Sequence, residues 1–177
     1  MVNGRPAYPG YISPTQLNVL APEDPTTGPV QVQVTKSQIP SDLFPVMKKD
    51  PMPAFFVIAT RYVAATHANG VSVGPPGLVP GGNFTPAAPG ETIQIFGTGF
   101  GAAVNGKTLA APVSLTSPTT VTIGGKLAAV AYAGMTAPGL DQLNVTIPDG
   151  LPDGDARVVA TIDGVTTQSN VFVTIKN

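Results

Sequence analysis

Apolar and polar residues alternate in several short runs along the chain. Residues 30–34, 92–96 and 120–123 each follow the two-residue period of a half-buried strand. Longer β-type runs meet at three Gly-containing dipeptides: Gly124-Gly125 between residues 121–123 and 126–132, Asp163-Gly164 between 157–162 and 165–167, and Asn69-Gly70 between 61–68 and 71–73. Tight turns of this kind need positive φ, which Gly, Asn and Asp tolerate. The pattern predicts an all-β protein with three such hairpins.

One segment interrupts this pattern. A helix could begin at Ser41, but Pro45 would break it within one turn, so we expect an irregular crossover over about residues 36–54. Two prolines within residues 51–53 then precede residues 55–58, the most apolar window of the chain. We expect a buried strand there, because prolines and lysines commonly flank strands that would otherwise aggregate. The alternative is an exposed apolar docking site.

An internal repeat organises the chain. The tetrapeptide Gln-Leu-Asn-Val occupies residues 16–19 and again residues 142–145, which lie 126 positions later. Each copy follows a Pro-containing turn and precedes a proline, a Gly-containing turn and a Val-rich strand. We therefore expect a complete β unit at residues 86–177 and the later part of a second unit at residues 1–80. Because an incomplete sheet exposes unpaired edges, residues 1–80 should pack on the complete unit or form a homo-oligomer through those edges.

Several of these motifs resemble a known family. Residues 89–101 look like the opening strand of IPT/TIG immunoglobulin-like domains, and residues 121–130 look like their V-x-I-G-G-x-x-A-x-V hairpin. Residues 132–148 are similar to the Y-A-G…P-G…Q-x-N-V-x-V-P pattern in the C-terminal Ig-like domain of Solibacter-type acidobacterial secreted proteins. Residues 11–18 match that family's Y-V-S-P-x-Q-x-N pattern, and residues 164–170 match its terminal G-G-V-x-S-N with a two-residue insertion.

The resemblance implies an Ig-like (IPT/TIG-type) β-sandwich at residues 86–177, preceded by a partial second β unit at residues 1–80. It further implies a non-catalytic module of a secreted or cell-surface bacterial protein. Met1 leads into residues 2–6 without an apolar stretch, so we expect no signal peptide within this sequence.

Composition argues against several classes of function. Lys and Arg number 9 against 10 Asp and Glu, and the net charge of −1 offers no electrostatic footprint for nucleic acid. With no Cys and 1 His, the chain can form neither a disulfide framework nor a multi-histidine zinc site. No apolar run is long enough to predict a membrane span. We also expect no cofactor. Gly97, Gly99 and Ala102 match the spacing of a dinucleotide fingerprint, but Asn105-Gly106 would break the helix that it needs.

The closely spaced glycines after residue 96 have a structural explanation. Gly97, Gly99 and Gly101 follow a β run, which predicts a bulge or sharp bend that is too crowded for side chains. Phe100 between them is expected to plug the end of the sandwich.

Polar residues of the repeated motifs are expected to satisfy the backbone. Asn18 and Asn144 should bond to backbone at a strand edge or corner, because short amides favour local backbone bonding. Tyr132 should pack in the sandwich with its hydroxyl bonded to backbone. His67 lies among small residues on a predicted strand and is expected at the edge of the core or in solvent. No G-x-S-x-G motif is present to supply a serine to it.

Two groups of residues are candidate binding sites. Tyr8 and Tyr11 lie in a Pro- and Gly-rich segment and could stack on sugar rings, in a chain without Trp. Asp149, Asp153 and Asp155 lie close together in one loop, and carboxylate oxygens are ligands that calcium prefers. Turn formation explains the two Asp-Gly pairs of that loop equally well.

These observations favour a non-catalytic Ig-like structural or adhesion module over an enzyme. Acid–base chemistry needs paired titratable groups in a pocket, whereas the carboxylates here cluster in turns. The alternative is a carbohydrate- or polymer-binding module, assisted by calcium if the Asp loop binds it. Partners are then protein or glycan surfaces.

Overall fold

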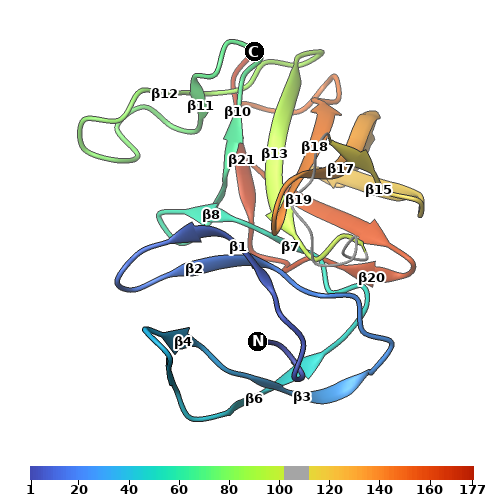
Figure 1. The fold of residues 1–177 in the computed structure, drawn as a ribbon. Helices are drawn as coiled ribbons and strands as arrows, with labels where there is room; N and C mark the ends of the chain where they lie inside the picture. Colours follow the sequence, from blue (N-terminus) through green and yellow to red (C-terminus); the bar gives the residue numbers. More distant parts are fainter. Residues whose placement is uncertain (102–111) are drawn as a thin grey trace.

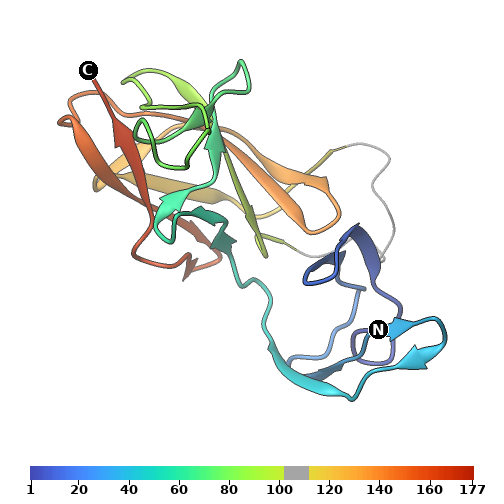
Figure 2. The ribbon, with the colours of Figure 1, turned by 90° about the vertical axis from the view of Figure 1, so that its left-hand side faces the viewer.

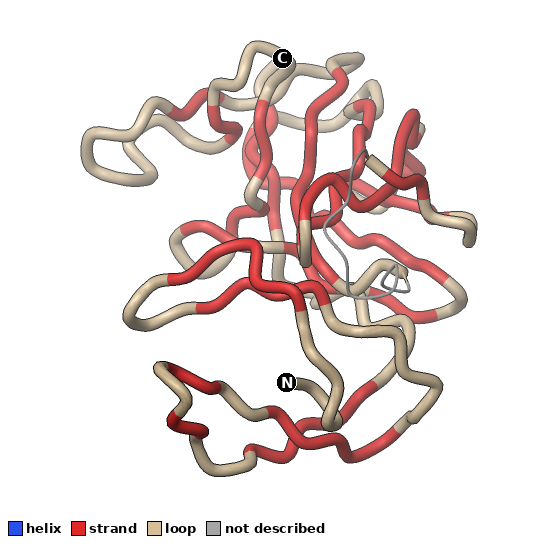
Figure 3. Tube along the Cα trace, in the orientation of Figure 1, coloured by secondary structure: helices blue, strands red, loops and turns tan. Residues whose placement is uncertain are grey.

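The computed structural model of the protein describes residues 1–101 and 112–177. These residues form strands and loops, and none of them is helical (Figure 3). The predicted all-β class is confirmed. Within the same residues there is accordingly no helix of the length and apolarity that crossing a membrane requires. Ala102 and Asn105-Gly106, which bear on the dinucleotide fingerprint, lie outside the described residues.

The main body is sandwich-like and consists of two mixed sheets (Figure 1). The first has 8 strands, in the order β12 (Phe84–Thr85), β11 (Ser72–Val73), β10 (Ala65–Thr66), β13 (Thr92–Thr98), β18 (Leu140–Thr146), β17 (Val130–Ala137) and β14 (Val113–Ser114), with β7 (Ala54–Phe55) also beside β13. The second has 7 strands, in the order β16 (Lys126–Ala128), β15 (Thr119–Ile123), β19 (Gly154–Ile162), β21 (Phe172–Ile175), β9 (Tyr62–Val63) and β8 (Val57–Ile58), with β20 (Val165–Thr166) beside β19. Neighbours pair antiparallel except β11 with β12 and β9 with β21, which are parallel.

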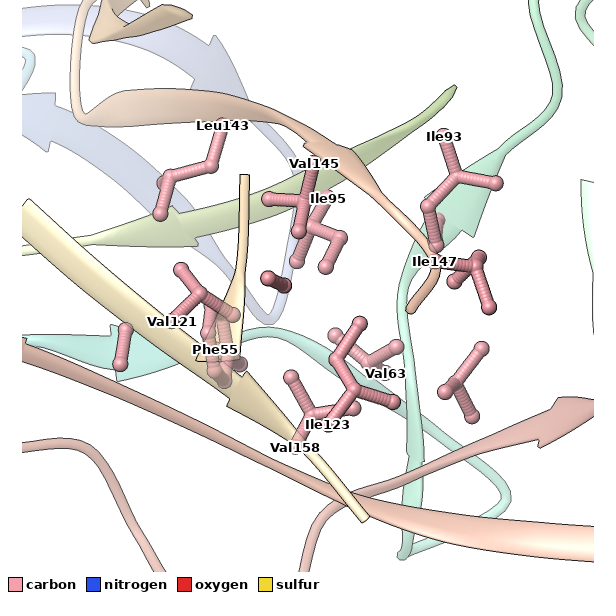
Figure 4. Close-up of a cluster of buried hydrophobic side chains, with 14 of the residues drawn as sticks. Phe55, Val63, Ile93, Ile95, Val121, Ile123, Leu143, Val145, Ile147 and Val158 are labelled. Atoms are coloured by element: carbon pink, nitrogen blue, oxygen red, sulfur yellow. The ribbon is translucent and has the colours of Figure 1, made fainter. Parts of the chain in front are cut away.

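Apolar side chains at every second position of the strands form one core between these sheets. Ile93 and Ile95 of β13 are fully buried, and Val121 and Ile123 of β15 belong to the same cluster from the opposite sheet (Figure 4). Each such side chain contributes about 1.5–3 kcal/mol when it leaves water. Phe100 is also fully buried in this cluster. The two-residue period therefore decides which side chains of each strand enter the core.

Residues 1–50 form small hairpins outside the two main sheets. β1 (Tyr8–Ile12) pairs with β2 (Leu17–Leu20), β3 (Gly28–Val32) pairs with β6 (Phe44–Lys48), and β4 (Thr35–Lys36) pairs with β5 (Ile39–Pro40). The β1–β2 hairpin lies between the main body and the β3–β6 hairpin (Figures 1 and 2). Its contact with the main body is close, because a Cβ on Gly139 would lie 2.7 Å from the carbonyl oxygen of Val19.

The predicted turns form, although one differs in type. Gly124 and Gly125 have φ values of 58° and 79° and join β15 to β16. Asp163 and Gly164, at 48° and 77°, join β19 to β20 in the same way. Between β10 and β11 the connection is longer: the Gly70 N–H donates to His67 O at 2.9 Å, and the Asn69 side chain accepts from the Val71 N–H at 3.0 Å, as in an Asx turn.

Sheet pairing runs through the boundary expected near residue 80. β11 pairs with β12 across it, and β9 and β10 belong to the two main sheets. Val63, Ala65 and Val73 are part of the common core. The strands that lie outside the main sheets all fall between Tyr8 and Lys48.

The expected irregular crossover at residues 36–54 contains a regular strand, so that expectation is wrong. β6 pairs with β3 along its whole length, with Pro45 opposite Gln31. A proline is tolerated there because β6 is an edge strand, which needs no N–H donor on its free side.

The apolar window at residues 55–58 is not one buried strand. Phe55 is buried, whereas Phe56 and Val57 are 39% and 42% exposed. The reason is that β7 and β8 belong to different sheets, so the chain crosses from one sheet to the other at Phe56.

Candidate functional site

The two N-terminal tyrosines lie on the same face of the β1–β2 hairpin. Tyr8 is opposite Leu20 and Tyr11 is opposite Asn18, with a register shift at Gly10 between them. Without that bulge, residues three positions apart would point to opposite faces. Both rings are exposed, at 43% and 52%. The structure therefore gives this pair the accessibility that stacking on a flat ligand requires.

The three loop aspartates are engaged by other groups. Asp155 accepts hydrogen bonds from the Arg61 guanidinium at 2.7 Å, the Tyr62 hydroxyl at 3.0 Å and the Thr174 hydroxyl at 2.9 Å. One oxygen of Asp153 accepts the backbone and side-chain N–H groups of Asn177, which lower the pKa of Asp153.

Asp149 accepts a hydrogen bond from Lys126 through its backbone oxygen, at 2.8 Å, and its carboxylate has no hydrogen-bond partner among the described residues. Across residues 1–101 and 112–177, no group of 3 or more His, Cys, Asp or Glu side chains could hold a metal ion. Asp149, Asp153 and Asp155 therefore do not form such a group in the described chain.

A buried carboxylate, Asp141, was not anticipated from the sequence. It is 3% exposed, and its Oδ2 accepts the Phe100 N–H at 3.0 Å. Its Oδ1 has no hydrogen-bond partner among the described residues. Burial raises the pKa of this carboxyl, and the Phe100 N–H opposes that rise only in part. One signal was present in the sequence: Asp141 is in phase with Leu143 and Val145, on the inward side of an alternating strand.

Asp141 lies beside a hollow where residues 1–50 meet the main body. The hollow has a volume of about 690 Å³ and is lined by apolar side chains of both parts, including Leu20, Val30 and Met135. Charged residues of both signs also line it, among them Arg5, Lys48, Glu23 and Asp24.

His67 forms a second arrangement that the sequence did not predict. It follows β10, and its Nδ1 pairs with the Glu91 carboxylate, which precedes β13. Its Nε2 lies 2.9 Å from the Thr85 hydroxyl of β12. Nε2 also lies 3.2 Å from the backbone oxygen of Thr85, and whether it donates or accepts depends on the tautomer of the ring. Hydroxyl, imidazole and carboxylate lie in the order found in nucleophilic hydrolases.

The surroundings of this trio favour a structural role. Acyl transfer needs backbone N–H groups aimed at the developing oxyanion. The N–H groups of Ala87, Ala88 and Gly90 instead donate to Thr174 O, Glu91 Oε2 and Ile147 O, at 2.9, 3.0 and 2.9 Å. The trio holds β10, β12 and the start of β13 together, which explains why a lone His lies at this edge of the sheet.

The repeated asparagines bond to side chains rather than to backbone, so that expectation is wrong. Asn18 Oδ1 accepts from Gln16 at 2.7 Å, and Asn144 Oδ1 accepts from Gln142 at 2.8 Å. Each pair lies two residues apart on one strand face, which brings the two amides within reach. The Tyr132 hydroxyl is buried without a hydrogen-bond partner among the described residues, so its expected backbone bond is not formed.

The three glycines after Phe96 lie where side chains do not fit. A Cβ on Gly97 would lie 2.5 Å from Ala54 O, one on Gly99 would lie 2.2 Å from Met52 O, and one on Gly101 would lie 2.7 Å from Leu115 Cδ2. Gly99 also has a φ of 78°. No bulge forms at Gly97, because β13 keeps a regular register with β18 there, and the chain bends after the strand, at Phe100 and Gly101. Gly97 and Gly99 allow residues 52–54 to approach closely.

Comparison of the chain with protein-family models, with curated proteins and with solved structures found no match.

Proposed function

We propose that this protein is a non-catalytic Ig-like module that bears load or mediates adhesion in a secreted or cell-surface bacterial protein. The two facing sheets with one shared core support an Ig-like assignment. The resemblance of residues 89–101, 121–130 and 132–148 to IPT/TIG-type and Solibacter-type domains supports the Ig type and the location outside the cell. The repeat of residues 16–19 at 142–145 supports a tandem arrangement of units.

The observation that carries the proposal is the parallel pairing of the last strand with earlier ones. β21 runs parallel to β9 at Phe172 and Tyr62, and Ile175 forms a parallel bridge with Ala87. The backbone bonds here are Phe172 N–H to Arg61 O at 2.8 Å, Ala87 N–H to Thr174 O at 2.9 Å and Lys176 N–H to Ala87 O at 3.0 Å. Tension between an earlier strand and the C-terminus shears a parallel pair, so its hydrogen bonds are loaded together instead of one after another.

Arg61 reinforces this pairing across three strands. Its guanidinium lies 4.4 Å from the centre of the Phe172 ring on β21 and binds Asp155 on β19 at 2.7 Å. Tyr62 of β9 donates to the same carboxylate. Burial and, after it, the hydrogen bond to Asp155 raise the pKa of Tyr62, so its hydroxyl stays a donor at neutral pH. This cluster links β9, β21 and β19 at the point where tension would enter.

Single-molecule force spectroscopy, with the protein pulled by its two termini, tests the proposal. Ala87→Pro removes the N–H that bonds Thr174 O and should lower the unfolding force. Val121→Ala is the matched control, because Val121 is fully buried but makes no contact with the parallel pair through its backbone ladder. Val121→Ala should lower the unfolding free energy while largely preserving the force. Equal loss of force in both variants would contradict the load-bearing role.

A second function, binding of carbohydrate or another polymer, is favoured by the Tyr8 and Tyr11 pair. Both rings are exposed on one hairpin face, as a stacking platform requires. Tyr8→Ala with Tyr11→Ala should abolish binding on a glycan array, whereas Tyr62→Ala should leave it unchanged. Absence of any bound glycan with the unmodified protein would remove this second function.

A further inference from the structure

Two stretches of the chain have the same local structure. Residues 16–41 and residues 142–167 are related by a constant offset of 126 positions. In both, a Gln side chain donates to the Asn two residues later, at 2.7 and 2.8 Å. In both, that Asn lies opposite a Tyr that follows a register shift: Tyr11 opposite Asn18, and Tyr132 opposite Asn144.

The second half of each stretch repeats as well. Ser37 and Gln38 have φ values of 49° and 68° in the β4–β5 turn, close to those of the β19–β20 turn. The Val34 N–H donates to the Ser41 hydroxyl at 3.1 Å, just as the Ala160 N–H donates to the Thr167 hydroxyl at 3.1 Å. Hairpins β1–β2 and β3–β6 therefore correspond to β17–β18 and β19–β21 of the main body.

The two copies differ in what covers them. In the main body, β18 pairs with β13 on its second edge and β19 pairs with β15. In the part of the chain that the structure describes, β2 pairs only with β1, and β3 only with β6 apart from a bridge from Val2 to Val32. Among residues 1–101 and 112–177, the first copy thus has no counterpart of the strands that complete the second.

The two copies also differ in the burial of their apolar side chains. Leu143, Val145, Ala160, Val171 and Val173 of the second copy are all at most 1% exposed. Their counterparts, matched by offset and by strand register, are 36–68% exposed: Leu17, Val19, Val34, Phe44 and Val46. We call these five residues the open inner face. Val30 and its counterpart Ala156 are both buried, at 2% and 7% exposed, so the difference does not extend to every apolar position of the two stretches. Apolar side chains that are buried in one copy and exposed in the other indicate a missing partner.

We propose that the open inner face binds an extended polypeptide segment that adds a strand to the free edge of β2. The chemistry of this partner is given by β13, which covers the corresponding edge in the second copy. β13 carries Ile93 and Ile95 on its buried face, opposite Val145 and Leu143. The partner strand should run antiparallel to β2 and place two apolar residues opposite Val19 and Leu17. Backbone bonds would then supply affinity and the apolar pair would supply register.

A second copy of this chain is not the expected source of that strand. β13 pairs with β18 on one side and with β10 and β7 on the other, so it is held on both edges. Releasing it would expose the core that it helps to form. This interaction is independent of the proposed load-bearing role, because the parallel strands of that role lie in the main body.

The experiment uses the whole protein and a synthetic peptide with the sequence of residues 89–101. Fluorescence anisotropy of the labelled peptide should show saturable binding. Binding should fall by about tenfold or more with Leu17→Asp, because a carboxylate would be buried without a partner. Leu127→Asp, at a side chain that is 72% exposed on β16, is the matched control and should bind normally. A peptide with Ile93→Asp and Ile95→Asp should not bind.

Cross-linking tests the register, because the chain has no cysteine of its own. A peptide with Gln94→Cys should form a disulfide with Asn18→Cys protein, since Gln94 lies opposite Asn144 in the second copy. Gln16→Cys, two residues out of register, should react much less. The proposal is overturned by no saturable binding, by equal binding of the double-Asp peptide, or by equal reaction of the two cysteines. Sedimentation velocity that shows a dimer abolished by Leu17→Asp would assign the face to a second copy and also overturn it.

Discussion

The repeated tetrapeptide allows the same mutation to be made in two environments. Leu143→Ala and Leu17→Ala remove the same atoms from the same local sequence, Gln-Leu-Asn-Val, on strands that form the same side-chain hydrogen bond. Leu143 is fully buried between the two sheets, whereas Leu17 is 41% exposed. Any difference between the two variants therefore reports tertiary environment and not local propensity.

The expected magnitudes follow from burial. Leu→Ala removes three carbon atoms, worth about 2.4 kcal/mol at about 0.8 kcal/mol each, and the cavity left in a core brings the loss to about 2.7–5 kcal/mol. We expect this range for Leu143→Ala. For Leu17→Ala, less area leaves the protein interior and no closed cavity forms, so we expect about 1 kcal/mol. The difference between the two variants should be about 2–4 kcal/mol.

Urea denaturation followed by far-UV circular dichroism measures this difference. At a slope of about 2 kcal/mol per M of urea, Leu143→Ala should shift the midpoint by about 1–2 M more than Leu17→Ala does. Leu127→Ala, at an exposed position of β16, should stay within about 0.5 kcal/mol of the unmodified protein. Equal losses at Leu17 and Leu143 would refute the argument that the first copy lacks its covering strands.

Four further outcomes are expected. Asp141→Asn should stabilise the protein at neutral pH, because burial raises the pKa of Asp141. The free-energy cost of holding an ionised Asp141 in the folded protein is absent below the ordinary Asp pKa of 3.8 and appears as pH rises through the folded-state value. The stability gained by Asp141→Asn, measured by denaturation at several pH values, should therefore vanish in acid. Gly99→Ala should prevent normal folding or lower the melting temperature sharply, because its Cβ would lie 2.2 Å from Met52 O at a φ of 78°. His67→Ala should lower the unfolding free energy by about 1–2 kcal/mol through loss of its bonds to Glu91 and Thr85. The unmodified protein should hydrolyse p-nitrophenyl acetate no faster than Thr85→Val does, and a Thr85-dependent rate would contradict the structural role of the trio.

The strand pattern and the tight turns could be predicted from the sequence because both depend on near neighbours. The two-residue period identified β13 and β15, and the φ requirement of Gly124-Gly125 located β16, the hairpin partner of β15. The repeat at residues 16–19 and 142–145 was equally visible. Site residues were harder to predict. Asp141 could have been noticed on the inward phase of its strand, but His67, Thr85 and Glu91 are brought together only by sheet pairing.

The sequence by itself determined which side chains share a strand face and where the chain can turn, since these follow from φ/ψ preferences and the two-residue period. Only the tertiary structure decided what each face meets. Leu17 and Leu143 have the same neighbours in sequence, yet β13 covers one and nothing in the described chain covers the other. Burial depends on strands brought in from distant parts of the chain, and a local pattern carries no information about whether such a strand is present.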